Sequence, residues 1–463
     1  MKKVNKMRFI ILVSVAASLS LAQIKMPVYQ RVVLENGAVL FLMPKKDLPL
    51  VSLSVSLRGG AESDPGGMQG LAAITTEMLL RGTSNRTRER LAEDMDQLGI
   101  TARAGTGKQF MSLGMEFLSK DFTKAEELLE DVLLHPSFAE NELKRLVEQK
   151  VDGVKVAKDR PQMALMEYFS GFYFGKEHPY GRSTNGDELS LPKINREAVE
   201  KFWKSAFVGK NLVIVAAGDF DPKTIEAQLR KLFEKLPPGT AYLTKNVVSP
   251  KLGESRLLLV DLPGATQTYF AIAQPGIERT NVHRTPLELV NTLFGGRFTS
   301  MLNDALRVDS GLTYGASSLV QLDRLPGAIS IVTFTKTETT EAAIDLALKQ
   351  LEKLQTTGID SEQLASAKAY VKGEYPTKRL ETIDQLSAVL TDMEVFGLNR
   401  GEVDDLISRI DSVTLEQANA IARRYYKTSG LVFVLVGDAA KIRKTMDKYA
   451  KDVRVVKISE PGF

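Results

Sequence analysis

The chain contains no cysteine, only three histidines and only one tryptophan among its 463 residues. The absence of cysteine excludes disulfide bonds, thiolate metal sites and a thiol nucleophile. The histidines, His135, His178 and His283, stand far apart in the sequence and do not form a metal-ligand pattern. No Gly-x-Ser-x-Gly elbow is present to support a serine hydrolase. The usual hydrolytic nucleophiles are therefore not indicated.

A long apolar run occurs only at the N-terminus. The run extends from Phe9 to Ala22 and follows four basic residues: Lys2, Lys3, Lys6 and Arg8. Small residues near its end favour cleavage after Ala22, so residues 1–22 are predicted to be a secretory signal peptide. An uncleaved membrane anchor is the alternative. We expect a periplasmic or secreted protein with no membrane span after cleavage, because no later stretch is long and apolar enough.

The sequence also carries little net charge. Its formal charge of +4 comes from 61 basic and 57 acidic residues, and the predicted signal peptide holds four of the basic ones. The mature chain is thus neutral overall. A neutral chain has no field suited to nucleic acid or anionic lipid, so neither is predicted as a partner.

The length predicts two domains, and an internal repeat supports that division. Residues Glu197 to Asp219 align without a gap on Glu416 to Asp438, at an offset of 219. Each copy is a helix followed by an apolar strand that ends in Gly-Asp. A polar, proline-containing linker at 241–254 would separate domains at 28–240 and 255–456. Two unrelated helix–strand–helix units are the alternative.

Each half mixes hairpin patterns with runs of helices. Asn36-Gly37, for example, lies between two apolar runs and indicates a β-hairpin. Strict strand–helix alternation is absent. The pattern predicts an α+β fold in which helices pack on one face of a largely antiparallel sheet.

The segment from Gly70 to Thr83, GLAAITTEMLLRGT, follows an alternating strand pattern and a glycine-rich loop. Gly-Leu-Ala at its start and Met-Leu-Leu-Arg-Gly-Thr at its end resemble the zinc helix of the pitrilysin/insulinase metallopeptidases, the inverted zincins. That family carries His-x-x-Glu-His in this helix, which supplies two imidazole ligands and a general base. In this chain the three positions are Ala73, Thr76 and Glu77. The zinc motif is degenerate.

The remaining ligand positions are altered as well. The family's third ligand, a glutamate, corresponds to Gly153, and the nearby acids Asp152 and Glu148 are expected on a solvated helix face. An alanine and a lone carboxylate cannot replace two imidazoles, and a threonine hydroxyl is too weak a base to deprotonate water. We therefore expect this chain to bind no metal. An unrelated metal at Glu77 of a homodimer is a minor alternative.

A second resemblance lies in the other half. The segments LFGGRFTSML, beginning at Leu293, and LRVDSGLTYG, beginning at Leu306, look like the Arg–Tyr motif of the same family. The matching residues are Arg307 and Tyr314. In active relatives this pair reaches the zinc site from the opposite domain, binds the peptide backbone and stabilises the tetrahedral intermediate. The alternative is a helix-end arginine and a packed strand tyrosine.

The resemblance covers nearly all of residues 28–456, including the segment from Asp261 to Thr268. It implies two homologous domains that close like a clam shell around a peptide-sized chamber. Related chains, including subunits of the mitochondrial processing peptidase, form heterodimers in which one subunit brings zinc and the other brings the Arg–Tyr pair. This chain would then be a zinc-less subunit, inactive alone, that binds peptide substrates and completes its partner's site. A catalytically dead structural or peptide-binding scaffold is the alternative.

Overall fold

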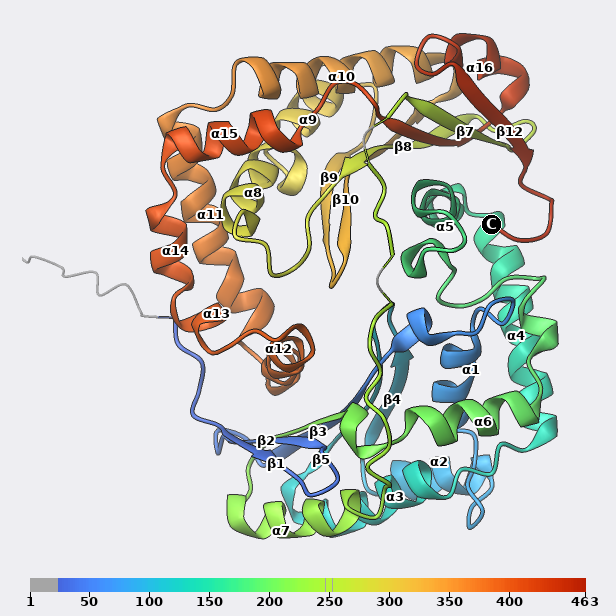
Figure 1. Cartoon of the computed structure of the whole chain (residues 1–463), viewed down its shortest axis with the longest axis vertical. Helices are drawn as coiled ribbons and strands as arrows, with labels where there is room; N and C mark the ends of the chain where they lie inside the picture. Colours follow the sequence, from blue (N-terminus) through green and yellow to red (C-terminus); the bar gives the residue numbers. More distant parts are fainter. Residues whose placement is uncertain (1–23, 246, 252) are drawn as a thin grey trace, which may run out of the picture.

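The structure is a computed structural model that describes residues 24–245, 247–251 and 253–463. The predicted signal peptide, residues 1–22, lies outside the described residues. Two six-stranded sheets face each other, and helices cover their outer faces (Figure 1). The predicted α+β class with two similar halves is confirmed.

The first sheet has the strand order β1-β2-β6-β3-β5-β4, and only the β2–β6 pair is parallel. Its strands are β1 (Gln30–Val33), β2 (Val39–Pro44), β3 (Leu50–Arg58), β4 (Thr101–Thr106), β5 (Phe110–Leu118) and β6 (Leu212–Gly218). The helices of this half are α1 (Leu71–Met78), α2 (Arg88–Gln97), α3 (Phe122–Leu134), α4 (Glu140–Lys158), α5 (Pro161–Phe174), α6 (Arg196–Ala206) and α7 (Pro222–Phe233).

The second sheet has the order β12-β7-β11-β8-β10-β9, with β12, β7 and β11 parallel and the other pairs antiparallel. Its strands are β7 (Arg256–Asp261), β8 (Gln267–Pro275), β9 (Ala316–Leu322), β10 (Pro326–Lys336), β11 (Val432–Gly437) and β12 (Asp452–Lys457). Its helices are α8 (Arg284–Asn291), α9 (Met301–Asn303), α10 (Thr340–Thr356), α11 (Ser361–Arg379), α12 (Ile383–Phe396), α13 (Gly401–Asp404), α14 (Leu406–Ser412), α15 (Leu415–Tyr425) and α16 (Ala439–Met446).

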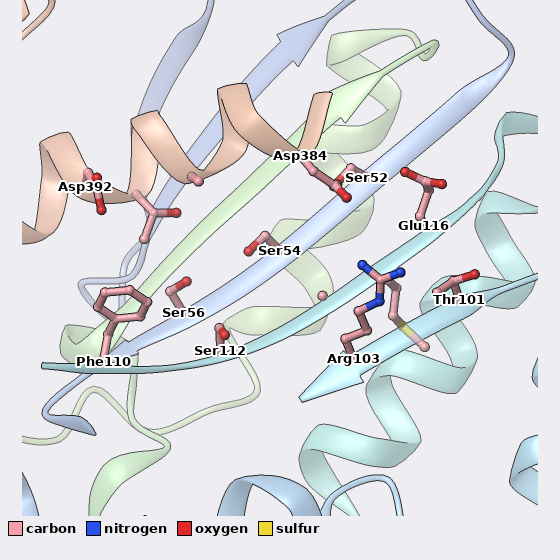
Figure 2. Close-up of a pocket in the computed structure, with 14 residues that line it drawn as sticks. Ser52, Ser54, Ser56, Thr101, Arg103, Phe110, Ser112, Glu116, Asp384 and Asp392 are labelled. Atoms are coloured by element: carbon pink, nitrogen blue, oxygen red, sulfur yellow. The ribbon is translucent and has the colours of Figure 1, made fainter. Parts of the chain in front are cut away.

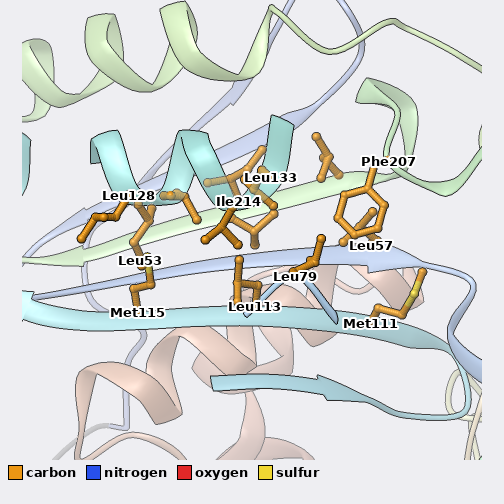
Figure 3. Packing of buried hydrophobic residues seen from close by; sticks show 14 of the residues in the cluster. Leu53, Leu57, Leu79, Met111, Leu113, Met115, Leu128, Leu133, Phe207 and Ile214 are labelled. Atoms are coloured by element: carbon orange, nitrogen blue, oxygen red, sulfur yellow. The ribbon is translucent and has the colours of Figure 1, made fainter. Parts of the chain in front are cut away.

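The core of the first half follows from the two-residue period of its strands. On β3, Leu53 and Leu57 point to the helical side, where Leu128 and Leu133 of α3 pack against the sheet (Figure 3). All four side chains are buried. Successive residues of a strand point to opposite faces, so the serines between these leucines must face the space between the halves.

Each half covers the inner face of the other half's sheet with one helix. Helix α5 of the first half packs on β8 and β11 of the second sheet, and α12 of the second half packs on β3 and β6 of the first. Buried residues such as Phe169 and Val434 form the first of these contacts, and Val215 and Leu390 form the second. The sequence analysis did not predict this exchange, which ties the two halves together.

The internal repeat extends to helix packing. Helix α1 contacts α4 and α6 in the first half, and α8 contacts α11 and α15 in the second. The connection between the halves is docked on the first: Tyr242 N donates to Asn211 Oδ1 at 2.6 Å, and Thr244 Oγ1 donates to Glu62 Oε1 at 2.8 Å. Among the described residues, no helix has the length and hydropathy needed to cross a bilayer.

Candidate functional site

Helix α1, which carries the degenerate motif, starts at a defined cap. The buried carboxylate of Asp64 accepts hydrogen bonds from Gly70 N at 2.8 Å and from Ala72 N at 2.7 Å. Gly70 has a φ of 94°, and a Cβ there would lie 2.9 Å from Asn185 O. Glycine is therefore required by conformation and by close approach.

The first two motif positions are packed into the protein. Ala73 is 3% exposed and Thr76 is 1% exposed. The Thr76 hydroxyl donates to Ala72 O at 2.7 Å and accepts from Thr106 Oγ1 of β4 at 3.1 Å. This hydroxyl therefore serves the helix and the neighbouring strand, and it is not available to activate water.

A lysine occupies the place beside the third position. Lys150 of α4 forms an ion pair with Glu77, and its Nζ also donates to Asn185 Oδ1 at 3.1 Å. The Lys150 side chain is mostly buried. An ammonium group so placed neutralises Glu77 and disfavours a divalent cation at the same point.

The zinc of the resembling family does not fit these residues. Gly153, at the predicted third-ligand position, is exposed and has open space where a Cβ would point. Asp152 and Glu148 are exposed too, as expected of a solvated helix face. Across the described ranges, no group of three histidine, aspartate or glutamate side chains could hold a metal ion.

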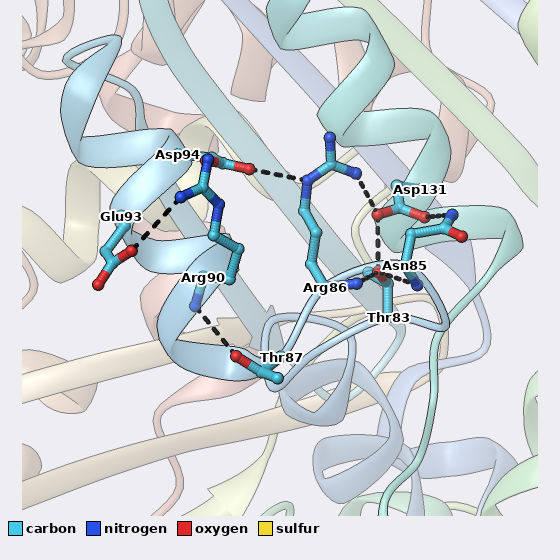
Figure 4. Close-up of polar contacts among 8 residues, drawn as sticks. All are labelled: Thr83, Asn85, Arg86, Thr87, Arg90, Glu93, Asp94 and Asp131. Atoms are coloured by element: carbon cyan, nitrogen blue, oxygen red, sulfur yellow. Dashed lines mark hydrogen bonds and ion pairs between the residues drawn. The ribbon is translucent and has the colours of Figure 1, made fainter.

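The end of the motif segment has a structural role (Figure 4). Asp131 of α3 accepts hydrogen bonds from Thr83 Oγ1, Asn85 Nδ2 and Arg86 Nη1, each at 2.6 Å. Burial disfavours the charged form of Asp131, but these three donors outweigh it and hold the pKa below its usual value. Thr83, the last residue of the resembling segment, therefore helps to anchor the loop that follows α1.

The three histidines lie in separate elements. His135 ends α3, and buried His178 accepts a hydrogen bond from Tyr180 N at its Nδ1. Desolvation lowers the pKa of His178 to about 4. His283 Nδ1 lies 2.7 Å from Tyr425 Oη. The structure brings none of them to the motif helix.

Arg307 lies in a π-helical turn, Asp304–Asp309, that leads toward β9. Its guanidinium stacks on the Phe298 ring at 4.5 Å, and Phe298 itself is 67% exposed. Within the described residues, the Arg307 side chain has no hydrogen bond and no ion pair. The structural alternative expected this side chain to bind helix-end carbonyls, but it accepts no such role among the described residues.

Tyr314 precedes β9 and is 83% exposed. Its ring centroid lies 6.3 Å from that of Phe334, which stacks on Tyr269 at 5.0 Å. Its phenol makes no hydrogen bond to any other described residue. Arg307 and Tyr314 both remain available for contacts outside the chain, and no polar or ring contact joins either of them to the α1 motif positions in the described part.

A cavity of about 300 Å³ lies between the first sheet and α12 (Figure 2). Polar and charged side chains line much of it: Ser52, Ser54 and Ser56 of β3, Ser112 and Glu116 of β5, Arg103 of β4, and Asp384 and Asp392 of α12. Ser52 Oγ donates to Asp384 Oδ1 at 2.7 Å. The sequence analysis missed these residues, although the alternation of serine with apolar residues along β3 was a visible signal.

Known proteins share this sequence and fold. The family Insulinase (Peptidase family M16) matches residues 41–186, and the family Peptidase M16 inactive domain matches residues 193–371. An uncharacterized zinc protease of Mycobacterium tuberculosis is 25% identical over 374 residues, which are 80% of this chain and 85% of that protein. Helicobacter pylori has a similar protein named non-peptidase homolog YmxG, 22% identical over 85% of this chain and 90% of its own length.

A crystal structure of a similar protein has the same fold as this chain. The crystal structure of a peptidase M16 inactive domain from Pseudomonas fluorescens superposes with a TM-score of 0.82 at 24% identity, covering 89% of this chain and 98% of that one. The two family matches together span most of the described chain. The chain belongs to the insulinase family, peptidase family M16, as a member that lacks the His-x-x-Glu-His motif.

Proposed function

We propose that this chain is the zinc-less subunit of a heterodimeric, extracytoplasmic metallopeptidase, and that it is inactive alone. The observation that carries the proposal is a contrast between two sites. Lys150 and tight packing occupy the motif positions. By contrast, Tyr314 is exposed, Arg307 is partly exposed, and neither side chain forms a hydrogen bond or an ion pair within the described residues. The donors of both side chains are therefore available to a ligand.

The proposed roles follow from the chemistry of each side chain. Arg307 presents a planar fork of donors, which suits peptide carbonyl oxygens and the negative charge that develops when an amide is attacked. Tyr314 adds one directed phenolic donor. The zinc ion and the attacking water would belong to a homologous partner subunit that carries His-x-x-Glu-His.

The test is reconstitution with such a partner. The mature chain, purified alone, should contain no stoichiometric zinc and cleave no peptide. Co-purification from the native source should recover a zinc-bearing homologue, and mixing the two should produce cleavage of a fluorogenic peptide. Zinc near one per chain in the isolated protein contradicts the zinc-less role.

The second candidate is a peptide-binding or structural scaffold. The Lys150–Glu77 ion pair favours it, because the motif region is stabilised in a form without metal. The similar Helicobacter pylori protein is named a non-peptidase homolog. A gene for a zinc-motif homologue beside this one supports the peptidase subunit, whereas a complex that never gains activity with any such homologue supports the scaffold.

A further inference from the structure

The second half contains a cavity of about 520 Å³ between α8 and α11. By their packing, these helices are the repeat counterparts of α1 and α4 in the first half. Phe110 of β5 and Asp392 of α12 line both this cavity and the one in Figure 2. The two cavities are therefore neighbours that share part of their walls.

A cluster of arginines dominates one end of this cavity. Glu402 accepts hydrogen bonds from Arg284 at 2.5 Å and from Arg279 at 3.2 Å, and Arg409 lies 3.7 Å from the same carboxylate. Glu402 and Arg284 each have 12% of their side chain exposed, and Arg279 has 16%. Three mostly buried guanidinium groups thus share a single carboxylate.

The other charges of the lining do not balance this excess. Lys378 pairs with Glu374 at 2.6 Å, and Arg379 pairs with Asp392 at 2.7 Å. Glu288 remains, and it forms no ion pair with any described residue. Glu288 is exposed to the cavity, although the protein around it raises the pKa of its carboxyl.

Two further observations show that the positive charge of the cluster is not fully compensated. Arg284 Nη1 and Arg409 Nε are buried and have no hydrogen-bond partner among the described residues. Burial, together with repulsion from Arg284, lowers the pKa of Arg279. When the positive charge of buried guanidinium groups exceeds the negative charge of the carboxylates around them, another anion that enters stabilises the cluster.

We propose that this cavity binds a carboxylate group of a peptide held between the two halves. The inference rests on the peptide-binding role proposed above and adds to it a preference for one chemical group. Guanidinium groups recognise carboxylates through paired hydrogen bonds. Part of the cavity wall is apolar or aromatic, formed by Val320, Leu322, Tyr370 and Phe396. A chain end with an apolar last residue therefore fits the cavity better than an isolated anion.

The test compares three rhodamine-labelled nonapeptides built from alanine, leucine and serine. One ends in a free carboxylate, one ends in a carboxamide, and one ends in a carboxamide but contains an internal aspartate. Fluorescence anisotropy with the full mature chain should show about tenfold tighter binding of the free acid than of the amide. Tight binding of the aspartate peptide assigns the subsite to acidic side chains, and weak binding assigns it to chain ends.

Variants distinguish binding of the carboxylate at this site from non-specific electrostatic attraction. Arg279→Gln should weaken binding of the free acid about tenfold and leave the amide unchanged. Glu288→Gln should strengthen binding of the free acid at pH 8, since it removes a competing negative charge. Arg103→Gln, in the cavity of Figure 2, is the matched control and should change acid and amide alike.

The outcomes are distinct. Equal affinity of wild-type protein for acid and amide overturns the subsite and leaves the proposed peptide binding intact. Binding of none of the three peptides overturns the peptide-binding role and the subsite together. If Arg279→Gln fails to fold, the comparison of acid with amide on the wild-type protein still decides the matter.

Discussion

Arg307→Ala should separate catalysis from folding in the reconstituted peptidase. Within the described residues the guanidinium forms no hydrogen bond or ion pair and stacks on the exposed Phe298 ring at 4.5 Å, and an exposed cation–π contact contributes about 0.5–1 kcal/mol. The melting temperature should therefore fall by no more than about 4 °C. Loss of one donor to a developing oxyanion costs about 2.7–4 kcal/mol, so kcat should fall about 100- to 1000-fold. Differential scanning fluorimetry and the cleavage rate of a fluorogenic peptide measure the two effects.

Arg297→Ala is the matched control. Arg297 Nε donates to Thr299 O at 3.0 Å, and its Nη1 donates to Ser366 Oγ at 2.9 Å, so this arginine is engaged within the fold. Its removal should lower stability by about 1 kcal/mol and leave kcat within about threefold. The reasoning is refuted if Arg307→Ala leaves turnover within twofold, or if it lowers the melting temperature by more than about 8 °C.

Substitutions at three other positions test the site and its supports. Phe298→Ala should lower kcat about threefold by freeing Arg307, and Phe298→Tyr should restore it; equal turnover in both variants contradicts the positioning role. Burial raises the pKa of Glu62 to about 7, so its stabilising contribution is present below pH 4.5 and is lost as the pH rises through 7. Glu62→Gln should therefore gain up to about 3 kcal/mol over wild type at pH 8 and nothing at pH 4, measured by urea unfolding; a constant difference refutes this. Leu390→Ala removes a fully buried contact between the halves, and should cost about 2–5 kcal/mol in unfolding free energy; a loss below 1 kcal/mol shows that α12 is not needed to hold them together.

Local patterns were enough to predict most of the elements of the fold. The helix and the apolar strand expected between Glu197 and Asp219 appear as α6 and β6. Their periods of 3.6 and 2 residues are properties of adjacent residues, and Asn36-Gly37 forms the turn between β1 and β2. The repeat of Glu197 to Asp219 likewise appears as equivalent helix–strand units in the two halves.

These patterns could not predict which elements pack against each other. Helices α5 and α12 each cross to the sheet of the other half, and no local pattern predicted which sheet either helix would cover. The same holds for Lys150, which is an ordinary residue of α4 until the fold places it beside Glu77. A sequence period fixes which face is apolar, whereas the partner of that face depends on long-range topology.

The sequence by itself determined that the motif positions are Ala73, Thr76 and Glu77, and that Arg307 and Tyr314 stand at the spacing of a known pair. It could not say whether that pair is packed or free. The tertiary structure decided this, because exposure depends on neighbours from distant segments: Phe298 lies under Arg307, and Phe334 lies beside Tyr314. It also gathered Arg279, Arg284 and Arg409 around one carboxylate, since residues over a hundred positions apart become neighbours only when α8 meets the helices that follow α12.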